Sequence, residues 1–239
     1  MDRMEVVAGR PRLNKYGWRM IAFMTTLTTA QLLALVAAAG TWTWWPSYAL
    51  MGMAATFQAS VVFLLASRNP DLLNARGRLL QNDTKRFDRL VLRLYIPTLF
   101  LTLITGAVDA GRLGASAMPL SATLVAYCAA GAGFLIVLWS MSVNQHFETT
   151  VRIQKERAHQ VIRNGPYRLV RQPGYLGAII VFAAIPPMLQ SVYAYIPAVV
   201  CIAIFVVRTR LEDDTLHREL AGYDAYAAEV RHRLAPFVW

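Results

Sequence analysis

Charged residues are scarce in this 239-residue chain, where Asp, Glu, Lys and Arg make up 16% and hydrophobic residues 56%. They are absent from four long stretches, which lie between Arg19 and Arg68, Arg93 and Asp109, Arg112 and Glu148, and Arg171 and Arg208. Soluble domains seldom have such a composition, so the sequence indicates an integral membrane protein.

Cysteine is nearly absent as well. Cys128 and Cys201 both lie inside uncharged stretches, so neither a disulfide nor a cysteine-based metal site is expected. The four histidines show no HExxH or similar spacing. We therefore predict no metal.

The uncharged stretches predict an all-α, polytopic helical bundle with about six membrane segments. A helix needs roughly 20 apolar residues to cross the hydrocarbon core. The expected segments are 19–40, 48–67, 91–110, 119–144 and a helical hairpin over 172–207. Pro186 and Pro187 fall near the middle of 172–207, so we expect the hairpin to bend there, with one arm that need not reach the far side.

The basic residues predict the orientation. Of the 24 Lys and Arg, all but Arg112 lie in the N-terminal tail, in the 68–93 and 145–174 connections, or from Arg208 onward. Six crossings place all of these on one side, which the positive-inside rule makes cytoplasmic, together with both termini. We expect a multi-pass protein of a bacterial inner (cytoplasmic) membrane. Its net charge of +10 indicates anionic lipid headgroups as partners and no nucleic acid.

The connections carry further predictions. Residues 68–93 suit a cytoplasmic helix lying on the membrane surface that starts at Asn69-Pro70, although a solvated connector remains an equal alternative. Residues 144–159 suggest a helix that leaves the membrane and delivers His159. We treat 1–239 as a single membrane domain, with membrane helices in 1–143 and a cofactor-binding core in 144–239.

Residues 159–177, HQVIRNGPYRLVRQPGYLG, combine arginines, aromatic rings, glycines and prolines, as a polar ligand site requires. Asn164-Gly165-Pro166 predicts a tight turn in which Gly165 lets the backbone approach a ligand. Pro173-Gly174 opens the next helix. Arg171 immediately precedes an apolar hairpin, so it needs an anionic partner from a ligand or from the protein.

A second polar cluster, Arg208 with Glu212, Asp213 and Asp214, follows the hairpin. Because the hairpin returns the chain to the side that it left, Arg171 and Glu212 should meet at the mouth of one cavity. Arg208 and Glu212 are one helical turn apart and can pair. The sequence therefore predicts a pocket with both signs of charge, suited to a zwitterionic ligand.

These two clusters resemble the isoprenylcysteine carboxyl methyltransferase (ICMT) family. The first resemblance is the pattern from His159 to Gly177. The second pattern comprises Arg208, Glu212, Asp213, Leu216, Gly222, Tyr223, Tyr226 and Pro236. Together the two patterns cover 144–239, whereas the earlier segments match only as generic membrane helices.

The resemblance implies S-adenosyl-L-methionine as methyl donor. Carried over by position, the cofactor site comprises His159, Val161, Gly165, Tyr167, Arg171, Gln172, Pro173, Tyr175 and Glu212, with catalytic roles for Arg171, Glu212 and Tyr175. Glu212 would face the cofactor's ammonium, and Arg171 would hold a carboxylate or orient the acceptor. The chain departs from the family pattern at Gln172, which replaces a His and cannot become cationic, and at Asp213, which replaces a Glu.

We therefore expect methylation of a lipophilic small molecule or lipid that enters from the bilayer, with O-methylation of a carboxylate favoured because a carboxylate needs no general base. Three alternatives stay open: N-methylation of a phospholipid amine, a sterol-type reductase using NADPH, and a non-catalytic membrane scaffold or sensor. The acceptor and the oligomeric state do not follow from the sequence.

Overall fold

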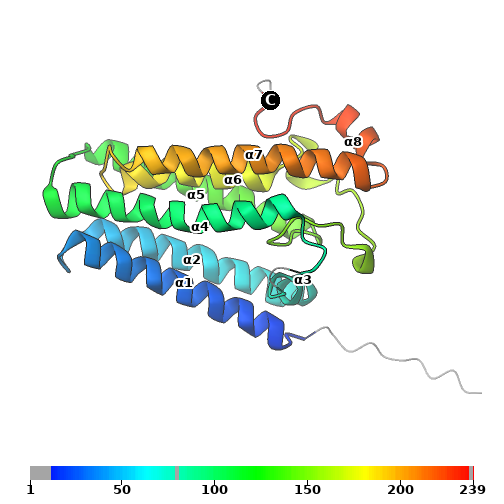
Figure 1. Ribbon diagram of the computed structural model, residues 1–239, viewed down its shortest axis with the longest axis horizontal. Coiled ribbons are helices and arrows are strands. Elements are labelled where there is room, and N and C mark those ends of the chain that lie inside the picture. The colour runs from blue at the N-terminus through cyan, green and yellow to red at the C-terminus, as the bar shows by residue number, and fades with distance from the viewer. Residues whose placement is uncertain (1–11, 79–80, 237–238) are drawn as a thin grey trace, which may run out of the picture.

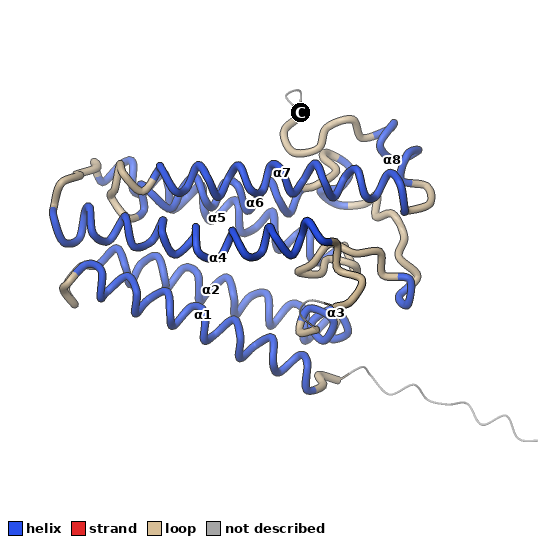
Figure 2. Tube along the Cα trace, viewed as in Figure 1, coloured by secondary structure: helices blue, strands red, loops and turns tan. Residues whose placement is uncertain are grey.

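A computed structural model describes residues 12–78, 81–236 and 239 of the chain. The described part is built from helices and loops and contains no strand (Figure 2). The long helices run side by side along one axis (Figure 1). This arrangement confirms the predicted all-α bundle.

The first two helices form an antiparallel pair, α1 (Lys15–Ala39) and α2 (Trp45–Arg68). The side chain of Asn14 accepts hydrogen bonds from two backbone N–H groups in the first turn of α1, as an N-cap residue does. Gly40 ends α1 in the left-handed conformation, with φ of +70°. Both helices fall close to their predicted ranges.

Two further long helices follow. α4 (Arg86–Gly106) continues as a π-helical segment, η1 (Ala107–Leu113), and α5 (Leu120–Val143) comes next. With α1 and α2, these make four helices within the described residues that are long and apolar enough to cross a membrane. Large apolar side chains such as Phe63, Leu101 and Leu135 are exposed on these helices, as lipid-facing residues are.

The predicted hairpin is formed by α6 (Pro173–Met188) and α7 (Tyr195–Glu219). Pro186 and Pro187 lie in the last turns of α6, and the chain reverses after them, over 189–194. The bend is therefore later than predicted. With 16 residues, α6 is about 24 Å long, shorter than the roughly 30 Å hydrocarbon core, as expected for one arm.

α6 is held against α5 by a contact between two glycines. A Cβ on Gly177 would lie 2.5 Å from the carbonyl oxygen of Gly133, and a Cβ on Gly133 would lie 2.7 Å from that of Gly177. Only residues without a side chain permit this approach, a frequent device between membrane helices. The contact fixes the position of α6, whose first turns carry Tyr175.

The polar connections gather at one end of the bundle, where Figure 1 shows α3 (Pro70–Arg76), the segment after α5 and α8 (Tyr223–Glu229). α3 begins as predicted, with Asn69 as its cap and Pro70 in its first turn, but it is much shorter than the predicted surface helix.

The predicted helix over 144–159 is wrong. This segment is irregular apart from a 3₁₀ turn, η2 (Lys155–Arg157). Its backbone bonds elsewhere instead: Val151 N donates to Asp88, and Val151 O accepts from Lys85 N. These tertiary bonds outweigh the local helical preference.

Candidate functional site

A cavity of about 410 Å³ opens at the polar end of the bundle. Its walls come from α3, the 144–172 segment, α6, α7 and α8, and its floor is aromatic, with Tyr95, Phe134, Phe182 and Phe205. The predicted site residues that line it are His159, Val161, Tyr167, Arg171, Gln172, Tyr175 and Glu212. The sequence analysis therefore located most of one wall.

Gly165 and Pro173 were also predicted to line the cofactor site, but neither is among the lining residues of this cavity. Gly165 forms the predicted turn, with φ of +58°, and starts a 3₁₀ turn, η3 (Gly165–Arg168). It faces α5, where a Cβ would lie 3.1 Å from Val143. Pro173 begins α6 in the position that suits proline.

Glu212 projects from α7 into the cavity and accepts a short hydrogen bond from the Tyr175 hydroxyl. Burial raises the pKa of Glu212, although nearby Arg208 opposes this effect. Among the residues that the structure describes, Glu212 forms no salt bridge within 4.0 Å. The carboxylate is thus available to a cation in the cavity.

Arg208 does not pair with Glu212 as the helical spacing predicted. Its Nε lies 2.9 Å from Asp88 Oδ1 on α4, and its Nη2 donates to Thr149 O at 2.8 Å. The guanidinium also covers the Tyr175 ring, 5.3 Å from the ring centroid. Asp88 is fully buried and supplies the counter-charge. It lies 120 residues before Arg208, so helical spacing could not predict this pair.

Arg171 has the protein carboxylate that it was expected to need, and the carboxylate is Asp213. Nε donates to Oδ1 at 2.8 Å and Nη2 to Oδ2 at 2.9 Å. Arg233 and the Tyr223 hydroxyl also donate to Asp213, at 2.6 and 2.7 Å. Burial alone would raise the pKa of Asp213, but these hydrogen bonds outweigh burial and lower it.

The same arginine fastens the C-terminal segment. Arg171 Nη1 donates to the carbonyl oxygens of Val230 and Arg231, both at 2.9 Å. The backbone N–H of Gln172 donates to Arg233 O, also at 2.9 Å. The guanidinium of Arg171 is therefore engaged mainly by protein groups.

His159 lies in the cavity wall beside His146, with ring centroids 4.5 Å apart. Burial, followed by the neighbouring His146, Arg152 and Arg157, lowers the pKa of His159 to about 4. Burial also lowers the pKa of His146. Both rings are neutral at pH 7 and can donate or accept hydrogen bonds, but neither brings a charge.

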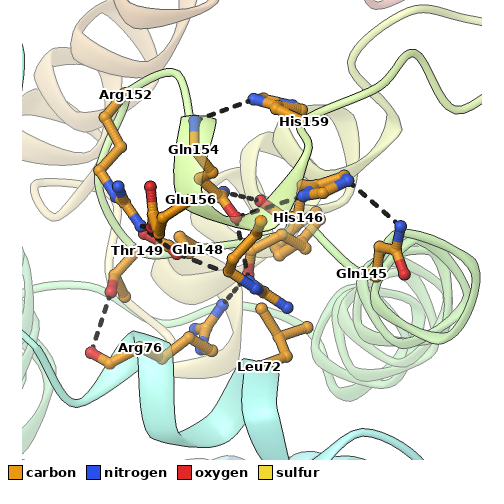
Figure 3. A network of polar contacts seen from close by, with 12 residues as sticks. Leu72, Arg76, Gln145, His146, Glu148, Thr149, Arg152, Gln154, Glu156 and His159 are labelled. Carbon is orange, nitrogen blue, oxygen red and sulfur yellow. Dashed lines mark hydrogen bonds and ion pairs between the residues drawn. The ribbon is translucent and has the colours of Figure 1, made fainter.

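A polar network holds the irregular segment in place (Figure 3). Arg152 donates to both carboxylate oxygens of Glu148 at 2.8 Å, and also to Asp83 and Glu156. Gln154 donates to His146 O at 2.7 Å. Together these bonds fix the wall formed by 146–159 without regular secondary structure.

Several other lining residues had not been predicted as site residues. They are Arg76, Asn144, His146, Glu148, Arg152 and Gln154. Tyr223 and Tyr226 also line the cavity, and these two belong to the second pattern of the family resemblance. The density of polar residues directly after α5 was a usable signal, whereas no local pattern linked Arg76 to this site.

Comparison with known proteins supports the resemblance seen in the sequence. Residues 121–221 match the model of the phospholipid methyltransferase family, and no curated protein matches the chain. The matched region runs from the start of α5 past α7, so it contains the 159–177 stretch, Glu212 and the α6–α7 hairpin. The phospholipid methyltransferase family belongs to the ICMT-like group of integral membrane methyltransferases, so residues 121–221 are similar to that group.

Proposed function

We propose that this protein transfers a methyl group from S-adenosyl-L-methionine to a lipophilic acceptor in the membrane, by O-methylation of a carboxylate. The observation that carries the proposal is Glu212, a carboxylate of the family-matched region that lines the cavity and has no salt-bridge partner among the described residues. An ammonium group of a ligand would supply the missing counter-charge.

The cavity has the chemistry that such a cofactor needs. Its volume of about 410 Å³ falls in the range of small-molecule pockets, roughly 300–1,000 Å³. Glu212 would hold the ammonium, while Tyr167, Tyr223 and Tyr226 offer aromatic surface for the adenine. Neutral His159 and Gln154 offer hydrogen-bonding groups. When bound, the cofactor supplies an electrophilic methyl group on a sulfonium.

The residues of the chain would contribute alignment and charge control. The hydroxyl of Tyr175 donates a hydrogen bond to the Glu212 carboxylate, and the guanidinium of Arg208 packs on the face of the Tyr175 ring. Arg171 anchors the C-terminal segment across the site. In an in-line displacement, holding the reactants and excluding water are the main protein contributions.

A second, apolar cavity of about 270 Å³ supports a lipophilic acceptor. It lies between α1, α2, α4, α5 and α6 and shares the lining residues Phe57, Tyr95, Phe134, Val181 and Phe182 with the first cavity. An acyl or prenyl chain in the apolar cavity would direct its headgroup toward Glu212 and Tyr175. The phospholipid methyltransferase match likewise points to a lipid substrate.

The choice of a carboxylate rests on the scarcity of suitable bases. An ammonium acceptor must lose a proton before methylation, and His159, with a pKa of about 4, is a weak proton acceptor. A carboxylate needs no base. N-methylation of a phospholipid amine is the second candidate, because the matched family is described by its phospholipid substrates. The match gives no support to the reductase alternative.

The test is calorimetric titration of S-adenosylhomocysteine into the purified protein in detergent, with NADPH in parallel. We expect saturable binding that Glu212→Gln weakens and that the control Glu219→Gln leaves unchanged, because Glu219 lies on the same helix but pairs with Lys85 outside the cavity. Binding of NADPH without S-adenosylhomocysteine would overturn the proposal. If S-adenosylhomocysteine binds, transfer of labelled methyl groups from S-adenosyl-L-methionine distinguishes the two reactions: labelled oleate indicates O-methylation, and labelled phosphatidylethanolamine indicates N-methylation.

A further inference from the structure

The charges around the main cavity can be matched one against another. Arg152 is bound by Glu148, Glu156 and Asp83. Arg171 is bound by Asp213, and Arg208 by Asp88. After these pairs are removed, two lining groups are left without a salt bridge to any described residue, the carboxylate of Glu212 and the guanidinium of Arg76. Glu212 is used by the proposed function, whereas Arg76 is not.

Arg76 is the last residue of α3, and its guanidinium reaches toward the 146–149 backbone (Figure 3). Nη1 donates to Phe147 O at 2.8 Å, and the charged group lies 6.0 Å from the Phe147 ring centroid. Its buried Nε has no hydrogen-bond partner among the described residues. The described part of the protein therefore does not satisfy every N–H group of this guanidinium.

The nearest carboxylate does not meet this need. Glu148 acts on Arg76 electrostatically, but both of its oxygens are taken by Arg152, and Arg157 approaches it at 3.6 Å. Burial lowers the pKa of Arg76 to about 10, so the group stays charged at pH 7. A half-buried guanidinium that has no salt bridge is costly, and proteins keep such a group mostly where it binds an anion.

The position of Arg76 favours the methyl acceptor over the cofactor. α3 lies outside residues 121–221, which match the family model and contain Glu212, the residue proposed to hold the cofactor's ammonium. Phe147, beneath Arg76, packs in the same apolar cluster as Phe57 and Val137, which line the main cavity. Phe57 also lines the apolar cavity, so a headgroup at Arg76 would have its chain beside that opening.

We infer that Arg76 forms an anion-binding subsite that holds the carboxylate or phosphate of the methyl acceptor. The inference rests on the proposed function and names the substrate class as anionic lipids. The planar guanidinium suits both oxyanions, since each presents paired oxygens to its N–H groups. Glu212 and Arg76 would then divide the two reactants between them.

The test measures binding in maltoside micelles from the concentration dependence of thermal unfolding. The probes are oleate against methyl oleate, and dioleoyl phosphatidate against dioleoylglycerol. The wild type should prefer at least one anion over its uncharged counterpart by tenfold or more. A preference in the oleate pair identifies a carboxylate, and one in the phosphatidate pair identifies a phosphate.

Arg76→Gln should abolish this preference and change the affinity for S-adenosylhomocysteine less than twofold. The control is Arg78→Gln, two residues further on, where the exposed Arg78 covers Tyr16 and does not line the cavity. It should behave as the wild type. Without added anion, Arg76→Gln should unfold at the same or a higher temperature, because it removes an unpaired buried charge.

Two results would overturn the inference: an anion preference unchanged in Arg76→Gln, or a tenfold loss of S-adenosylhomocysteine affinity, which would assign Arg76 to the cofactor's carboxylate. If the Gln variant does not fold, Arg76→Lys keeps the charge and should bind the anion three- to tenfold more weakly; unchanged binding would count against the subsite. If the wild type binds no S-adenosylhomocysteine, the proposed function is wrong. The anion preference of the wild type and of Arg76→Gln would still test the Arg76 subsite independently.

Discussion

Arg171 and Asp213 meet through two parallel hydrogen bonds, Nε to Oδ1 at 2.8 Å and Nη2 to Oδ2 at 2.9 Å, in a buried setting. Arg171 lies just before α6 and Asp213 lies near the end of α7, so the pair joins the two arms of the hairpin at the polar end of the bundle. Removing one partner leaves the other charge buried and alone.

We therefore expect Arg171→Ala and Asp213→Ala each to lower the free energy of unfolding by about 3–5 kcal/mol. In the double variant the loss of unfolding free energy should be smaller than the sum of the two single losses, because both substitutions remove the same interaction. Thermal unfolding followed by circular dichroism measures it. Arg163→Ala is the matched control: its pair with Glu229 is exposed, and little change is expected. Additive losses would show that the two residues act separately.

Glu212→Gln should raise the dissociation constant of S-adenosylhomocysteine about 10- to 100-fold, because it removes the charge proposed to face the ammonium. The variant keeps the shape of the side chain and an oxygen that can still accept from Tyr175. Its unfolding temperature should stay near that of the wild type. An affinity within twofold of the wild type would move the ammonium site elsewhere.

Tyr175 should show two separable effects. Tyr175→Phe removes the hydroxyl that holds Glu212 but keeps the ring beneath Arg208, so we expect about a 3- to 10-fold loss of S-adenosylhomocysteine affinity with little change in unfolding temperature. Tyr175→Ala also removes the ring, which packs against Phe205, and should lower the unfolding temperature clearly. Equal destabilisation by both variants would contradict this division.

His159 predicts a dependence on pH. Its folded-state pKa of about 4 lies below the ordinary value of 6.5, so between these values the unfolded chain binds a proton that the folded protein does not. The free energy of unfolding should therefore fall as the pH drops from about 6.5 to about 4. His159→Gln should show a weaker fall over this range. Identical slopes would mean that His159 titrates normally.

The glycine contact predicts a steric effect. Gly177→Ala and Gly133→Ala each place a methyl group within 2.7 Å of a backbone oxygen of the facing helix, which must then shift. We expect a loss of about 1–3 kcal/mol from such overpacking. Gly131→Ala on the same helix is the control, since its nearest neighbour is the flexible end of Met53 at 3.6 Å. A tolerated Gly177→Ala would show that the helices can separate without cost.

The parts of the structure that depend on neighbouring residues in the sequence could be predicted, whereas those that depend on contacts between distant residues could not. Membrane helices are dictated by composition and length, so α1, α2, α4 and α5 were found from uncharged stretches alone. The cap at Asn69 and the turn at Gly165 were equally local. The 159–177 stretch could be recognised as a candidate site because its polar residues interrupt apolar sequence.

Pairings between distant segments could not be read in the same way. Helical spacing predicted that Arg208 would meet Glu212, yet Asp88 of α4 is its partner, because packing of α7 against α4 brings the two together. The 144–159 segment was mistaken for a helix because its backbone partners, Lys85 and Asp88, lie far away in sequence. Arg76 was overlooked for the same reason.

The docking of the C-terminal segment onto Arg171 has a consequence for a shortened chain. The groups that this arginine binds follow it by roughly sixty residues, at Val230 and Arg231. These partners follow the last long helix, α7, by only about ten residues. A chain that ends after α7 would therefore contain every long helix of the bundle but lack the carbonyl groups that fasten this wall of the cavity.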